Sequence, residues 1–236
     1  MNKTGIIGAM EIEVNLLQEQ LEQCRITEKA GMSFYEGLLC GVPVVIVKSG
    51  AGKVNSAICA QILADLFDVT HIINTGVAGS LDADVDYCDI VISTEVCYHD
   101  MHNEAMGYKP GEQPRPGWLL YTADEKMIAC AVEACCKVIS RMEQPPAIHK
   151  GRIVTGDWFI NSAERKAAVI AKFGGLCTEM EGASIGHSAY LNGIPFVVIR
   201  SISDKADDSA DVDFHSFELE AARRSMEIVK EMVQKL

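Results

Sequence analysis

The sequence predicts an α/β fold, a three-layer α/β/α sandwich in which helices cover both faces of a mixed central sheet. Apolar runs typical of buried strands alternate with segments of helical periodicity along the whole chain. The 236 residues contain no low-complexity linker and no internal repeat, and this length fits one large domain. We therefore expect residues 1–236 to form a single domain.

The first half of the chain begins with a run of glycine and β-branched residues at 4–10, which predicts a buried strand. Residues 11–21 then carry apolar side chains at helical spacing, and Gly-Ala-Gly at 50–52 forms a tight connection before an alanine-rich helix at 53–67. Further strands are expected at 33–39, 42–48, 71–79 and 89–95.

The second half opens with residues 98–119, which are rich in glycine and proline and predict a long loop. A loop of this length within a compact domain is usually functional. Helices are expected at 124–140, 162–173, 181–191 and 214–236, with Asn161 or Ser162 as a cap, and strands within 147–155 and at 195–202.

The composition argues against several classes of partner. The formal net charge of −12 leaves little positive surface for nucleic acid or an anionic membrane. No stretch approaches the ~20 apolar residues of a membrane-spanning helix, and the first residues do not resemble a signal peptide. We therefore expect a cytoplasmic protein.

The nine cysteines are irregularly spaced and include no CxxC pair. This pattern is typical of reduced cysteines that serve as small core residues. His99 and His102 form an HxxH, but two histidines in a loop rarely make a metal site. We expect neither a metal nor an organic cofactor.

Acidic residues follow several of the predicted strands, at the sheet edge where α/β proteins bind ligands. Glu13 follows the first strand, Glu181 lies where a strand becomes a helix, and Asp204 follows the strand that also carries Arg200. Helix capping alone explains acids at helix starts. Together, however, three carboxyl groups at one edge suit proton transfer and the stabilisation of a cationic sugar.

Five motifs, GIIGAMEIEV, INTGVAG, TGDWFIN, TEMEGASIGH and PFVVIRSISD, resemble the methylthioadenosine/S-adenosylhomocysteine nucleosidase family within the nucleoside phosphorylase superfamily. They occur in the family's order and cover nearly the whole chain. The resemblance implies a nucleoside phosphorylase-like fold and hydrolysis of the N-glycosidic bond of both nucleosides, releasing adenine. It also implies a homodimer and no cofactor.

The resemblance assigns catalysis to two acids. Asp204, in RSISD, is similar to the general acid that protonates N7 of adenine, and Glu13, in GAMEIE, to the base that deprotonates the attacking water. Glu181, in EMEG, resembles the residue that binds the ribose hydroxyls. Because Asp204 must hold a proton, its pKa must be raised above the usual value of about 3.9.

The resemblance also implies the contacts to the substrate. Phe159 matches an aromatic residue that stacks on adenine, Ile160 the position whose backbone reads the adenine edge, and Met180 a neighbour of the ribose. Ser203 is similar to a serine that supports Asp204. The remaining matched positions are Arg200 near the water, Phe214 beside the ribose and its 5′ substituent, and Met10, Val77, Ala78 and Gly79 in the walls.

Val77 stands where the family often has a serine that helps to hold the water. Valine cannot hydrogen-bond, so we expect water placement to rest on Glu13, Arg200 and Glu181.

The long loop is implied to complete the 5′ pocket of the partner subunit. Asn103 is more polar than the usual aliphatic residue, which leaves open the preferred 5′ group, including 5′-deoxyadenosine or a futalosine-type group. The loop positions concerned are Asn103, Met106, Tyr108 and Pro114.

Two alternatives remain open at this point. A phosphate-dependent purine nucleoside phosphorylase would need several arginines around the anion, whereas Arg200 is the one obvious candidate and Glu13 would repel phosphate. A non-catalytic protein that binds adenosine compounds would not need both Asp204 and Glu13.

Overall fold

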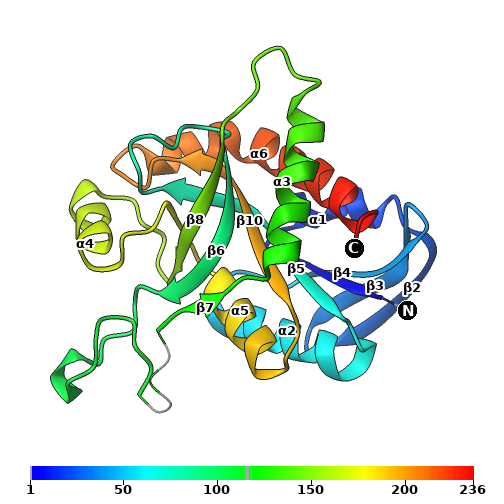
Figure 1. The fold of residues 1–236 in the computed structure, drawn as a ribbon, viewed down its shortest axis with the longest axis horizontal. Helices are drawn as coiled ribbons and strands as arrows, with labels where there is room; N and C mark the ends of the chain where they lie inside the picture. Colours follow the sequence, from blue (N-terminus) through cyan, green and yellow to red (C-terminus); the bar gives the residue numbers. More distant parts are fainter. Residues whose placement is uncertain (1, 115–116, 118) are drawn as a thin grey trace.

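The computed structural model describes residues 2–114, 117 and 119–236, and it is built around a ten-stranded mixed sheet (Figure 1). The strands follow the order β10-β6-β8-β9-β5-β1-β4-β3-β2, and β7 pairs with β6. The strands are β1 (Thr4–Gly8), β2 (Glu22–Lys29), β3 (Met32–Leu39), β4 (Val42–Lys48), β5 (His71–Ser80), β6 (Ile90–Tyr98), β7 (Tyr121–Thr122), β8 (Ile148–Thr155), β9 (Cys177–Glu179) and β10 (Phe196–Asp204). The helices are α1 (Glu11–Gln18), α2 (Lys53–Phe67), the 3₁₀ turn η1 (Glu104–Met106), α3 (Glu125–Ile139), α4 (Ala163–Phe173), α5 (Gly182–Leu191) and α6 (Ala210–Val233).

The strands that build the functional edge run parallel to one another. β1 pairs in parallel with β4 and β5, and β10 pairs in parallel with β5, so β1, β5 and β10 end on the same edge. β10 also pairs antiparallel with β6, which closes β5, β10, β6, β8 and β9 into a ring. The predicted mixed sheet is confirmed, and its closure at one end adds a feature that the sequence pattern did not predict.

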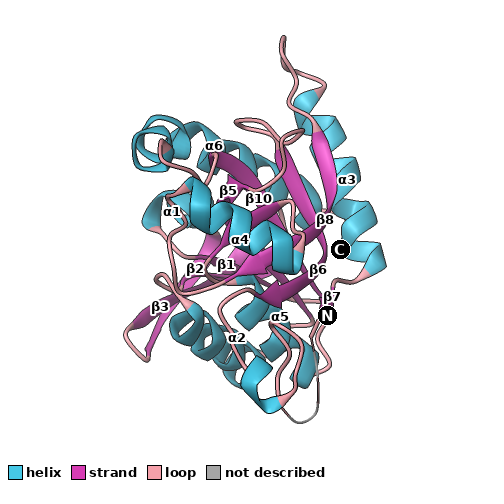
Figure 2. Ribbon diagram, turned by 90° about the vertical axis from the view of Figure 1, so that its left-hand side faces the viewer, coloured by secondary structure: helices cyan, strands magenta, loops and turns pink. Residues whose placement is uncertain are grey.

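Helices cover the sheet on both faces (Figures 1 and 2). α2 and α5 pack on one face, and α1, α3 and α6 pack on the other. Adjacent β1 residues serve different cores, since Ile7 packs with the α2 side and Ile6 with the α1 side. This burial on both faces explains why the strand reads as an unbroken apolar run. The predicted three-layer arrangement is therefore confirmed.

Several element boundaries differ from the predictions. β2 was not predicted, because it is an edge strand whose side chains are mostly charged or polar and exposed. β10 continues to Asp204 instead of ending at residue 202, so this acid belongs to the strand itself. α6 begins at Ala210, four residues earlier than expected. None of the described helices has both the length and the apolar character needed to cross a membrane.

The cysteines are all free thiols, but they are not all core residues. Cys24, Cys40 and Cys136 are exposed, so the prediction of a core role is wrong for these three. Cys24 lies on the exposed edge strand β2, and Cys40 lies in the turn between β3 and β4. The buried cysteines are Cys59, Cys97, Cys130, Cys135 and Cys177.

The Asp124 side chain caps α3, and this bond predicts a measurable loss of stability. Its Oδ1 accepts the N–H groups of Lys126 at 3.0 Å and Met127 at 2.9 Å. Asp124→Ala should lower the free energy of unfolding by about 1 kcal/mol, because two backbone donors lose their acceptor. Urea denaturation would measure the change. Asp124→Asn keeps an acceptor and should lose less, and an Ala variant as stable as the wild type would contradict the cap's contribution.

Candidate active site

A cavity of about 340 Å³ lies at the edge where β1, β5 and β10 end. This volume is within the range of small-molecule sites. All the site residues predicted for a chain's own cavity line it, except Arg200. The cavity brings them together although the three strand ends are far apart in sequence. The lining residues are Ala9, Met10, Glu13, Ala51, Val77, Ala78, Gly79, Trp158, Phe159, Ile160, Thr178, Glu179, Met180, Glu181, Ser203, Asp204, Phe214 and His215.

Glu13 is held in the cavity by backbone N–H groups. Its Oε2 accepts from Ala9 at 2.7 Å and Met10 at 2.9 Å, and its Oε1 accepts from Val77 at 3.1 Å. A Cβ at Gly76 would lie 2.4 Å from Oε1, so a glycine is needed beside this carboxyl. Glu13 thus caps α1 and also faces the cavity. Burial raises its pKa, and the charge of Arg200 and the three N–H groups oppose that rise.

Asp204 ends β10 and is 2% exposed. Its Oδ1 accepts the N–H of Ala206 at 2.8 Å, and its Oδ2 accepts the hydroxyl of Ser203 at 2.9 Å. A Cβ at Gly79 would lie 2.6 Å from Oδ1, so this glycine admits the carboxyl group. Burial raises the pKa of Asp204, and the two hydrogen bonds lower it by less. This direction agrees with the requirement for a protonated acid.

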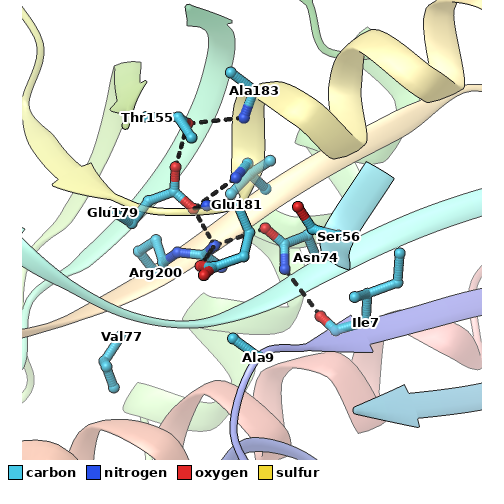
Figure 3. Close-up of polar contacts among 12 residues, drawn as sticks. Ile7, Ala9, Ser56, Asn74, Val77, Thr155, Glu179, Glu181, Ala183 and Arg200 are labelled. Carbon is cyan, nitrogen blue, oxygen red and sulfur yellow. Dashed lines mark hydrogen bonds and ion pairs between the residues drawn. The ribbon is translucent and has the colours of Figure 1, made fainter. Parts of the chain in front are cut away.

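The two acids of TEMEG have different surroundings (Figure 3). Glu179 Oε2 accepts the N–H groups of Glu181 at 3.0 Å and Gly182 at 2.7 Å at the start of α5. Glu179 also accepts from the Thr155 hydroxyl and from the Arg200 guanidinium. The capping role therefore belongs to Glu179, and Glu181 makes no side-chain cap bond.

Glu181 is consequently free to face the cavity. Its Oε1 accepts the N–H of Gly52 at 2.8 Å, and its Oε2 lies 3.8 Å from Arg200 Nη2. Burial, together with the adjacent charge of Glu179, raises the pKa of Glu181 to about 8. This carboxyl group can therefore hold a proton near neutral pH in the unliganded site.

Arg200 lies behind the cavity wall, which corrects the expectation that it lines the substrate site. It is 1% exposed, its guanidinium bonds Glu179, and its Nη2 lies 2.6 Å from Asn74 Oδ1 (Figure 3). The side chain leaves the strand four residues before its end and is drawn inward by the buried carboxylate. Its Nε is the one guanidinium nitrogen that has no partner among the described residues.

Aromatic side chains form the opposite wall. The rings of Phe159 and Phe214 lie edge to face, with centroids 5.9 Å apart and an angle of 80° between their planes. Ile160 is buried next to them. Trp158 and His215 also line the cavity, and the sequence analysis assigned a role to neither. Trp158 lies within the motif TGDWFIN but beside the position matched to adenine stacking, and His215 lies in none of the five motifs.

The four loop positions predicted for the partner's pocket do not line the cavity of their own chain. Figure 1 shows the loop after β6 projecting away from the sheet. Met106 is exposed, and Asn103 Nδ2 donates to Glu112 O at 3.2 Å. Tyr108 and Pro114 belong to the same loop.

The part of the chain that the structure describes gives no indication of a metal centre. Among the described residues, no group of three or more His, Cys, Asp or Glu side chains is arranged to hold a metal ion. The two histidines of the HxxH diverge, since His99 is buried beside Phe173 whereas His102 is exposed next to Glu104.

The arrangement combines four buried carboxyl groups, those of Glu13, Glu179, Glu181 and Asp204, with an aromatic wall. Glu13 and Asp204 come from different strand ends and face one cavity. No lysine or arginine is among the described residues that line it. Such a site suits a neutral or cationic aromatic compound and supplies groups for giving and taking protons.

Comparisons with known proteins agree with this description. The model of the phosphorylase superfamily matches residues 3–234. A protein of Exiguobacterium sp. named 5′-methylthioadenosine/S-adenosylhomocysteine nucleosidase is 43% identical over 237 residues, which cover 99% of this chain and 98% of that protein.

Two solved structures are also similar. The nucleosidase of that name from Neisseria meningitidis, in complex with methylthio-immucillin-A, has a TM-score of 0.93 and 36% identity, with 100% of both chains covered. The one from Colwellia psychrerythraea, in complex with adenine, has a TM-score of 0.91 and 40% identity, with 100% of this chain and 96% of that chain covered. By sequence and by fold, the chain belongs to the 5′-methylthioadenosine/S-adenosylhomocysteine nucleosidase family of the phosphorylase superfamily.

Proposed function

We propose that this chain hydrolyses the N-glycosidic bond of 5′-methylthioadenosine and S-adenosylhomocysteine and releases adenine and the 5-substituted ribose. The observation that carries the proposal is the pair of buried acids, Asp204 and Glu13, whose pKa values are both raised and which face one cavity. The family of the chain and the ligands of the similar structures support the substrate class. We propose that one domain, residues 1–236, performs the reaction.

In this mechanism Asp204 acts on the leaving group. The bond between C1′ and N9 breaks with its electron pair moving to adenine, and Asp204 donates its proton to N7, so that a neutral base departs. Ser203 holds the carboxyl group through Oδ2. A positioned acid of this kind contributes about 10²- to 10⁴-fold to a rate. The Phe159 ring would stack on the base and Ile160 would contact its edge.

Glu13 acts on the water. The water oxygen bonds to C1′ while Glu13 takes a proton from it, and the carboxyl oxygens of Glu13 and Glu181 stabilise the cationic sugar. Since Val77 offers no side-chain hydrogen bond, the water would be held by Glu13, Glu181 and the Nε–H of Arg200. Glu181 would also bind the ribose hydroxyls, with Met180 and Phe214 beside the sugar.

The charges around the cavity disfavour phosphate as the nucleophile. Four carboxyl groups line the cavity, and the nearest cation, Arg200, lies behind the wall and is paired with Glu179. A phosphate would have to enter next to Glu13, where the buried Arg200 offers one N–H at Nε in place of the several arginines that would neutralise the anion. Water carries no such charge, so the site favours hydrolysis over phosphorolysis.

We further propose a cytoplasmic homodimer in which the loop after β6 completes the partner's 5′ pocket. The loop projects on the side of the sheet that carries α2 and α5 (Figure 1). That side exposes apolar side chains, namely Val54 and Ile58 of α2, Leu191 of α5 and Met106 of the loop. Apolar residues exposed together favour a protein contact.

A product assay tests the proposed reaction directly. Incubation with 5′-methylthioadenosine should release adenine and free methylthioribose at a rate that does not change when phosphate is added. Chromatography of the products, repeated with S-adenosylhomocysteine and 5′-deoxyadenosine, would also give the 5′ preference. A phosphate-dependent rate with a sugar phosphate as product would contradict hydrolysis, and binding without product would favour a non-catalytic protein.

The Asp204→Asn variant should lose turnover but keep its affinity for adenine. The amide preserves the shape of the side chain and can still hydrogen-bond N7, but it cannot deliver a proton to the leaving group. We expect kcat to fall by about 10²- to 10⁴-fold, with the adenine Kd from calorimetry within a few-fold of the wild type. Near-normal turnover would remove Asp204 from the acid role.

The pH dependence of kcat should show an alkaline limb that belongs to Asp204. The group is active when protonated, so the rate is lost as the pH rises through its pKa, and burial moves that loss to higher pH than for an exposed aspartate. Rates measured with a phenolate-leaving riboside, which needs no protonation, should lack this limb. Glu13→Gln should lower kcat yet retain the limb, and a limb unchanged in Asp204→Asn would contradict the assignment.

A further inference from the structure

Lys53, the first residue of α2, joins three segments that meet beside the cavity. Its Nζ lies 2.6 Å from Asp100 Oδ2 and 3.7 Å from Asp157 Oδ2, and its backbone N–H donates to Asp157 Oδ1 at 2.7 Å. The N–H of Asp157 donates to the same Asp100 oxygen at 2.8 Å. We call Lys53, Asp100 and Asp157 the lysine clasp.

The clasp holds two carboxylates together through one ammonium group. Asp100 is largely buried, and its Oδ1 has no hydrogen-bond partner among the described residues. Its ionised form therefore depends on the donors to Oδ2, which are Lys53 and the N–H of Asp157. Without the ammonium, the two carboxylates would repel, with Asp100 the less exposed of the two, at 20% against 47% for the Asp157 side chain.

The wall that faces the base begins at the clasp. Trp158, Phe159 and Ile160 follow Asp157 directly and line the cavity. The Phe159 side chain is 38% exposed, so its own burial fixes it weakly. The far end of this loop is held by the Ser162 cap of α4, which is a long bond of 3.4 Å to the N–H of Arg165. The near end is held by the clasp.

The same helix start also holds the ribose side of the cavity. The N–H of Gly52 donates to Glu181 Oε1 at 2.8 Å, and the next N–H, that of Lys53, donates to Asp157. Gly52 has a φ of +96°, and a Cβ there would lie 3.0 Å from Asp157 Oδ1. Two consecutive N–H groups thus tie Glu181 and the loop at 157–160 to one rigid point.

We propose that Lys53 is a positioning residue that sets the affinity for the adenine ring by holding loop 157–160 in place, without touching the substrate. The inference rests on the proposed function, because it assigns this loop to the base. A positioning role for Lys53 predicts that its replacement weakens substrate binding but leaves the rate of the chemical step nearly unchanged. A purely structural role predicts no such separation.

The test compares Lys53→Met with the wild type. KM for 5′-methylthioadenosine and Kd for adenine should each rise about tenfold, which corresponds to about 1.4 kcal/mol, while kcat changes by less than about threefold. In the Lys53→Met/Asp100→Asn double variant the repulsion is relieved, so both constants should return to within about threefold of the wild type. Steady-state kinetics and calorimetry give these values.

Lys235→Met is the matched control, because Lys235 forms an exposed ion pair with Glu133 beyond the far end of α6. Its KM and Kd should equal those of the wild type.

Unchanged KM and Kd in Lys53→Met, or a fall in kcat alone, would overturn the proposal, even if the melting temperature drops. If Lys53→Met does not fold, Lys53→Arg and Lys53→Gln replace it, and equal adenine affinities in those two would overturn the proposal. A wild type that does not hydrolyse the substrate contradicts the proposed function instead, and the adenine Kd still tests the clasp.

Discussion

The buried ion pair between Arg200 and Glu179 is the constraint on which the rest of the site depends. Both side chains are almost completely removed from solvent, and such pairs seldom add net stability, because both charges lose their hydration. Here the pair fixes charge and geometry. Glu179 accepts hydrogen bonds from Arg200, from the Thr155 hydroxyl and from the first N–H groups of α5, and it thereby holds the helix start in place. Because the Arg200 guanidinium is paired with Glu179, it neutralises the neighbouring acids only in part.

That shortage of positive charge explains the chemistry of the other three carboxyl groups. Burial raises the pKa of Glu13, Glu181 and Asp204. The opposing effects, chiefly the charge of Arg200 for Glu13 and Glu181 and two hydrogen bonds for Asp204, do not cancel this rise. Two of these acids differ in what surrounds them. Glu13 accepts three N–H bonds and lies within the field of Arg200, which favours the ionised form, whereas Asp204 has two hydrogen bonds and acidic neighbours. Environments that push the pKa values of two acids apart in this way suit Glu13 to the role of a base and Asp204 to the role of an acid.

The sequence contained enough to predict this sheet edge, and it failed where the partner of a residue lies far along the chain. Apolar periodicity located most strands, and the acids after them identified the cavity. Glu179 was overlooked because the pattern TEMEG does not reveal which acid caps the helix, a question decided by Thr155 and Arg200. The orientation of Arg200 was also beyond prediction, since residues within one strand say nothing about a carboxylate from β9. β2 was not predicted because this exposed edge strand lacks the alternation of apolar and polar residues that marks a half-buried strand. The roles of individual residues remain predictions from motifs and geometry.

The same electrostatics bear on why a member of the phosphorylase superfamily should use water. A fold that brings strand ends together around a nucleoside can admit either water or phosphate as the nucleophile. The charges where the nucleophile enters then decide which of the two binds. In the proposed mechanism that point is occupied by Glu13, which is anchored by N–H groups that would otherwise be available to an anion. The helix start that could have held a phosphate is therefore already filled by a carboxylate of the chain itself. An uncharged nucleophile meets no such competition, and the group that we propose to exclude phosphate is the same group that we propose to take the proton from water.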